Sequence, residues 1–114
     1  MAQTIGKLGE LLEAHFGMQT TYRLSPPAFQ IGVAVTQLVG YDPNRLGIVI
    51  VNTGATTAYL SPENTIAAGA GIVLAPNGGS VSLNWDKDFD LVAQQWFAIA
   101  GVATNCMVLE VIGI

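Results

Sequence analysis

The 114-residue chain has few charged side chains and an acidic balance: 4 Lys or Arg, 8 Asp or Glu, a net charge of −4, and 51% hydrophobic residues. Soluble domains average about 25% charged residues, so we expect apolar surface that other copies or a large partner cover. The acidic balance argues against a nucleic-acid partner, which requires a basic face, and the apolar runs are shorter than the roughly 20 residues that span a membrane.

Residues 4–16 are the one segment with helical periodicity. An apolar stripe recurs there at three- and four-residue intervals, and Gly17 is well placed to end the helix in the left-handed conformation. An isolated helix of this length is marginal in water, so the stripe must pack on a neighbouring subunit, a partner or the chain's own sheet. We therefore predict an N-terminal helical arm (1–17), a β domain (18–114), and a partner or subunit interface formed by Ile5, Leu8, Leu12 and Phe16.

From residue 18 onwards the pattern is β throughout. Strands are expected at 20–24, 30–39, 46–52, 57–60, 72–74, 81–85, 91–93, 96–100 and 106–112. Residues 46–52 are apolar on both parities, which predicts a central strand buried on both faces, and the short turn after them predicts a hairpin with 57–60. Asn77-Gly78 supplies the positive φ of a tight turn. About eight short strands with regular turn signals indicate a mainly β fold, an antiparallel β-sandwich or jelly roll with a short N-terminal helix.

Candidates for metal chemistry are weak. Asp86, Asp88 and Asp90 stand at alternate positions, as at the start of a calcium loop, but Leu91 and Phe97 occupy the places where that loop needs Gly and Glu. A solvated polar turn is one interpretation, and a cation shared between subunits is the other. Sensitivity of the assembly to a chelator would distinguish them.

The residues that catalysis requires are also scarce. His15 and Cys106 are the single histidine and cysteine, so neither a metal cluster nor a conventional disulfide framework is available within the chain. The sequence carries no nucleophile elbow or phosphate-binding glycine loop. We predict no enzymatic activity and no cofactor, and we expect Cys106 to be a small buried hydrophobe.

Arg45 lies in the turn that precedes the most apolar strand, directly after Tyr41-Asp42-Pro43-Asn44. A guanidinium at that place predicts an anchoring contact with backbone carbonyls or a carboxylate. Arg45→Ala is then expected to lower the free energy of unfolding by about 1–2 kcal/mol, the value of a charge-assisted hydrogen bond. We also count Arg45 as a candidate interface residue.

An ordered series of motifs runs through residues 42–112. Asp-Pro-Asn-Arg leads into the apolar strand and Asn-Thr-Gly, and Ala-Tyr-Leu-Ser, Pro-Asn-Gly-Gly, Phe-Ala-Ile-Ala and Val-Leu-Glu-Val follow. This order resembles small virion proteins of tailed bacteriophages. The resemblance implies a virion structural protein, above all a capsid decoration (cement) protein that binds the major capsid protein on the outer capsid surface as a homotrimer. A tail, collar or head-fibre component is the alternative, and no catalytic residues are implied.

Two functions of other classes compete with this interpretation. A glycan-binding or receptor-recognition module would use exposed aromatic side chains, for which the candidates are Tyr22, Tyr41, Tyr59, Trp85 and Trp96. A cupin-type enzyme would need a histidine cluster that one histidine cannot supply.

The N-terminus lacks the features of a signal peptide, so we expect synthesis in the host cytoplasm and a soluble chain until assembly. Deleting residues 1–17 should leave a folded β body that binds its partner poorly.

Overall fold

The computed structural model describes residues 10, 17, 19–67 and 69–113. The predicted helix, with Ile5, Leu8, Leu12, Phe16 and His15, therefore lies outside the described residues apart from Glu10. Gly17 has a φ of 73°, the left-handed conformation expected of it.

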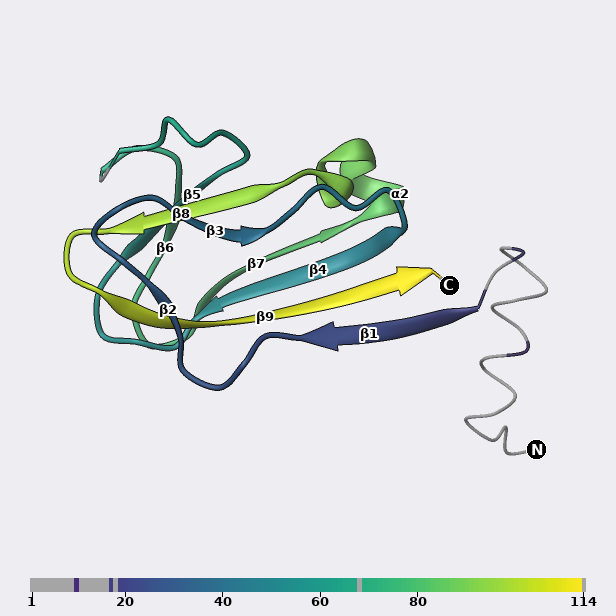
Figure 1. The fold of residues 1–114 in the computed structure, drawn as a ribbon, viewed down its shortest axis with the longest axis horizontal. Coiled ribbons are helices and arrows are strands. Elements are labelled where there is room, and N and C mark those ends of the chain that lie inside the picture. Colours follow the sequence, from purple (N-terminus) through teal and green to yellow (C-terminus); the bar gives the residue numbers. More distant parts are fainter. Residues whose placement is uncertain (1–9, 11–16, 18, 68, 114) are drawn as a thin grey trace.

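The chain folds into two antiparallel sheets, which confirms the prediction of a mainly β, sandwich-like fold (Figure 1). The larger sheet contains β1 (Thr20–Leu24), β2 (Phe29–Ile31), β4 (Arg45–Asn52), β7 (Gly79–Asn84) and β9 (Thr104–Gly113). The smaller contains β3 (Thr36–Val39), β5 (Ala58–Ser61), β6 (Ile72–Leu74) and β8 (Trp96–Ala100). The orders are β1-β9-β4-β7, with β2 also on β9, and β3-β8-β5-β6. A helical segment, α2 (Trp85–Asp88) followed by the 3-10 turn η1 (Phe89–Ala93), joins β7 to β8.

The core lies between the two sheets, where alternate residues of each strand meet. Ile48 and Ile50 of β4, Leu60 of β5 and Trp96 of β8 are almost fully buried in one cluster. The other parity of β4 is only half-buried at Gly47, Val49 and Val51, so the expectation of burial on both faces was wrong for this strand. Its outward residues are as apolar as its inward ones, which is why the sequence pattern did not distinguish the faces.

Within the described residues, no helix is long and apolar enough to cross a membrane.

The expected strand 30–39 is two strands that belong to different sheets. β2 pairs with β9, whereas β3 pairs with β8. Between them Gly32 N–H donates to Thr36 Oγ1 at 3.2 Å and Gly32 O accepts from Ala100 N–H at 3.1 Å, so the chain bends across the end of the sandwich. Ile31 is buried while Val33 is 65% exposed, because the two residues no longer share a face.

The predicted hairpin between 46–52 and 57–60 is also wrong. β4 pairs with β7 and β9, whereas β5 pairs with β6 and β8 in the other sheet. The buried side chain of Asn52 directs this crossing: its Nδ2 donates to Thr56 O at 2.7 Å and Leu74 O at 3.1 Å, and its Oδ1 accepts from Thr104 Oγ1 at 3.0 Å. Its carboxamide therefore bridges both sheets.

Residues 85–93 form helical turns, so the expected strand at 91–93 was wrong, and the exposed polar turn expected around the three aspartates is helical. Asn84 N–H donates to Asp88 Oδ2 at 2.9 Å, which closes the first turn with a side chain. Val92 then points into the core, and Gln94 N–H donates to Leu91 O at 3.3 Å to end the 3-10 turn. The other expected strands and the Asn77-Gly78 turn, with φ of 59° and 112°, are confirmed apart from shifts of their ends.

Candidate functional site

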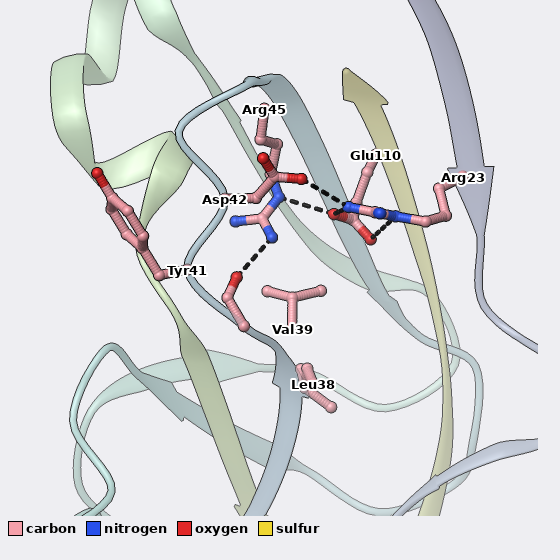
Figure 2. Close-up of a pocket in the computed structure, with 8 residues that line it drawn as sticks. Arg23, Leu38, Val39, Tyr41, Asp42, Arg45 and Glu110 are labelled. Atoms are coloured by element: carbon pink, nitrogen blue, oxygen red, sulfur yellow. Dashed lines mark hydrogen bonds and ion pairs between the residues drawn. The ribbon is translucent and has the colours of Figure 1, made fainter. Parts of the chain in front are cut away.

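Arg45 is the hub of a hydrogen-bond network at the end of the sandwich next to the helical segment (Figure 2). The residue is 2% exposed. Its Nε donates to Glu110 Oε2 at 2.8 Å, its Nη1 to Val92 O at 3.1 Å and Gln94 O at 3.0 Å, and its Nη2 to Gly40 O at 2.7 Å. The predicted anchoring contact is confirmed, with a carboxylate and backbone carbonyls together. The assignment of Arg45 to a subunit interface stays a prediction.

Arg23 of β1 completes the network from the solvent side. Its Nη2 donates to Glu110 Oε2 at 3.0 Å and to Asp42 Oδ2 at 2.9 Å, and its Nε donates to Glu110 Oε1 at 3.3 Å. Its side chain is 52% exposed, against 1% for that of Arg45. Asp42 is itself fixed, because Asn44 N–H donates to its Oδ1 at 2.9 Å. Two guanidinium groups thus balance two carboxylates across β1, β9, β4 and the β3–β4 loop.

The network shifts the titration of its members. Burial by itself would raise the pKa of Glu110, but the hydrogen bonds and charges of Arg23 and Arg45 outweigh burial and hold that pKa below its ordinary value. The Asn44 N–H, and then Arg23, lower the pKa of Asp42. The bond with Glu110, supported by Asp42, raises the pKa of Arg23. The folded state therefore favours the ionised form of all three.

A half-open pocket of about 380 Å³ lies over this network. Leu38 and Val39 supply aliphatic walls, and Tyr41 stands exposed at the rim (Figure 2). The lining carboxylates of Asp42 and Glu110 already accept from arginine side chains, and the lining contains no thiol, hydroxymethyl or imidazole group. We therefore interpret the pocket as the surface of a structural network, formed by Arg23, Asp42, Arg45 and Glu110, which we call the clamp.

The sequence did not predict Glu110 and Arg23 as partners of Arg45. One feature does indicate that Glu110 is paired: it is the one charged residue in the apolar run 106–112, and it has the parity of buried Cys106 and Val108. A carboxylate on the inward side of a strand requires a cationic partner. Its parity therefore could have indicated the pair, although the identity of the partner depends on the sheet order.

The remaining candidate residues are dispersed. No three His, Cys, Asp or Glu side chains gather as a metal site among the residues that the structure describes. Asp86, Asp88 and Asp90 follow helical turns and do not share one face of a strand. Cys106 is buried, as expected, and burial raises the pKa of its thiol to about 11. A thiol with that pKa stays protonated near neutral pH and is a poor nucleophile.

The aromatic candidates for a glycan-binding face are divided by the fold. Trp96 is in the core, where its Nε1 donates to Leu91 O at 3.2 Å, and Tyr59 is half-buried. Tyr22, Tyr41 and Trp85 are exposed, but they stand on β1, on the β3–β4 loop and on α2. The five aromatic residues therefore do not form one shared surface.

The outward side of the larger sheet is the most unusual surface among the described residues, and we call it the uncharged face. Its cross-strand rows are Tyr22–Val111–Gly47–Asn84, Leu24–Leu109–Val49–Ser82 and Met107–Val51–Ser80. A sheet with one solvated side normally alternates apolar-in and polar-out. Here β1, β9 and β4 carry apolar residues outwards, and no member of the rows is charged. Tyr22 is 70% exposed, and Leu24 and Val111 are also exposed.

Comparison with known proteins adds no assignment to these surfaces. No protein-family model, curated protein or solved structure matches the chain.

Proposed function

We propose that this chain is a structural subunit of a virion, a capsid decoration (cement) protein that associates with its own copies, as a homotrimer, and with the major capsid protein on the outer capsid surface. The observation that carries the proposal is the uncharged face. A surface of Tyr, Leu, Val and Met side chains without charges releases water on contact and has no ion to desolvate.

The size of the uncharged face favours an assembly over an isolated dimer. Four strands spaced about 4.8 Å apart, covered over roughly 20 Å of their length, present on the order of 400 Å². Two such faces would together bury on the order of 800 Å², which is below the 1,200–2,000 Å² or so of a stable protein interface. Contacts of this size become strong when several act at once, as they do for a trimer attached to a repeating shell.

The order of motifs in residues 42–112 supports a virion as the place of this assembly, because it resembles small virion proteins of tailed bacteriophages. The clamp around Arg45 suits a part of a shell, since it ties β1, β4, β9 and the helical segment together at one end of the sandwich. The predicted arm, residues 1–17, would extend the contact to a neighbouring subunit.

The first test is the mass of the protein in solution, measured by size-exclusion chromatography with light scattering. We expect a mass above that of one chain for the wild type and the mass of one chain for Val111→Lys, which places a charge in the uncharged face. Val102→Lys is the matched control, because Val102 is an exposed valine in the turn between β8 and β9. A monomeric wild type, or equal masses for all three proteins, would overturn self-association through this face.

The second test is cosedimentation with undecorated capsids and, separately, with isolated tails. Saturable binding to capsids supports the decoration function, and binding to tails alone would replace it with the tail or collar alternative. A glycan array provides the third arm. Binding to a glycan in the absence of any virion component, without binding to capsids, would instead favour a receptor-recognition module.

A further inference from the structure

The helical segment displays apolar side chains that the core does not use. Phe89 is 75% exposed, and Trp85 and Leu91 are about half exposed on either side of it in the sequence. The backbone of Phe89 has a φ of 54° and a ψ of −130°, a conformation that residues other than glycine rarely adopt. Such a conformation is costly and persists where the surrounding structure holds it, often at binding sites.

Phe89 and Leu91 border a shallow depression of about 550 Å³. Its other walls come from Pro62 and Glu63 after β5, and from Asp88, Asp90 and Gln94 around η1. The depression thus combines an exposed aromatic ring with three carboxylates contributed by two separate segments. Apolar side chains next to polar and charged ones are the usual composition of a surface that recognises a protein segment.

The charge of the depression indicates what binds there. Arg23 and Arg45 pair with Glu110 elsewhere in the molecule. The lining of the depression has three carboxylates and no Lys or Arg, and Lys87 lies next to Asp88 in the sequence without lining it. A second copy that faced this depression with its own would place two acidic borders together, so the two depressions would repel each other. A complementary partner carries Lys or Arg next to an apolar side chain.

We propose that this depression is a docking site for a basic, apolar segment of another protein. An apolar side chain of that segment packs against Leu91, an Arg or Lys lies over the ring of Phe89, and Glu63 and Asp90 pair with the flanking cations. The site is separate from the uncharged face, and the inference does not depend on the virion assignment.

The experiment uses a random dodecapeptide library selected on the full chain, followed by titration calorimetry of the enriched peptides. We expect enrichment of Arg or Lys beside a large apolar residue, and affinity that falls with added salt. Phe89→Ala should weaken binding by about tenfold or more, as expected for a central aromatic anchor. Tyr41→Ala, an exposed aromatic on the β3–β4 loop, is the matched control and should bind like the wild type.

Phe89→Gly distinguishes a loss of peptide binding from a loss of folding. Glycine accepts the positive φ, so this variant should melt at the same temperature as the wild type or higher while still losing the peptide. The combined Glu63→Gln and Asp90→Asn variant should flatten the salt dependence. A selection that enriches no basic peptide, affinity that Phe89→Gly leaves unchanged, or a glycan as the one ligand bound would each overturn the proposal.

Discussion

Replacing Arg45 with alanine removes the centre of the clamp. The change leaves Glu110, which is 7% exposed, with Arg23 alone, and it takes a donor from the carbonyls of Gly40, Val92 and Gln94. Removing one partner of a buried ion pair typically costs about 3–5 kcal/mol when the other charge is left without compensation. Because Arg23 still pairs with Glu110 after the change, we expect a loss at the lower end of that range, about 3 kcal/mol, which is more than the 1–2 kcal/mol expected from one charge-assisted bond.

Urea unfolding at pH 7 and one fixed protein concentration, followed by tryptophan fluorescence and circular dichroism, measures this loss. Arg23→Ala is the matched control, because it removes a guanidinium from the same Glu110 carboxylate on the solvent side. That variant should lose about 1 kcal/mol or less, the usual contribution of a solvent-exposed ion pair. The contrast between the two arginines isolates the effect of burial.

A loss below about 1 kcal/mol for Arg45→Ala, or equal losses for both variants, would refute this reasoning. A second variant tests the cause of the loss. Arg45→Met combined with Glu110→Leu replaces the buried pair with apolar side chains, and it should recover part of the stability that Arg45→Ala loses. No recovery would mean that the three backbone carbonyls, and not the isolated carboxylate, account for the effect.

Three further predictions concern pH, packing and thiol reactivity. Because folding lowers the pKa of Asp42 and of Glu110, their ionised forms stabilise the fold fully at pH values above the ordinary pKa values of 3.8 and 4.5. The free energy of unfolding, measured in urea, should fall as the pH drops below these values, and it should fall less steeply in Glu110→Gln. Gly54→Ala should lose about 1–3 kcal/mol because its methyl group would overlap Thr104 Oγ1, whereas Gly101→Ala, with open space around it, should change stability by under about 0.5 kcal/mol. Cys106 should react with Ellman's reagent at pH 8 about a hundredfold slower in buffer than in urea.

Each of these three has a contradicting result. A free energy of unfolding that is constant from pH 7 to about pH 3 would mean that the ion pairs do not stabilise the fold. Equal melting temperatures for Gly54→Ala and Gly101→Ala would show that the loop after β4 can move away from Thr104. Equal thiol reaction rates in buffer and in urea would place Cys106 outside the core.

Local patterns in the sequence predict the strands well and their pairing poorly. The bounds of β1 and β8 follow from alternating apolar residues between turn signals, and the Asn77-Gly78 turn follows from the φ that it needs. Neither the crossing after Asn52 nor the bend at Gly32 has a local signal. A short turn has the same sequence pattern whether it joins neighbours in one sheet or crosses to the other. The hydrogen bonds of Asn52 and Gly32 with nearby threonines are local, but those with Leu74 and Ala100 depend on distant residues.

The candidate site shows the same division. The place of Arg45 before the apolar strand predicts that it anchors something, but its partners Glu110 and Val92 lie far along the chain and meet it through the sheet order. The alternation Asp86, Asp88, Asp90 suggests a strand, yet Asp88 closes a helical turn on Asn84, which no periodicity in so short a segment distinguishes. The uncharged face could be inferred only as a property of the whole composition, because its rows combine residues from four strands.

The position of β9 in the larger sheet also sets the order in which the chain can fold. Residues 104–113 pair with β1, β2 and β4, all of which the ribosome makes earlier. Until β9 emerges, β1 and β2 have no strand partner among the described pairings, and their backbone groups and the apolar side chains of β4 are open to other nascent chains. Non-local sheets of this kind close in milliseconds to seconds. The sandwich therefore closes only after β9 has been made, and until then the open strands favour association with other chains.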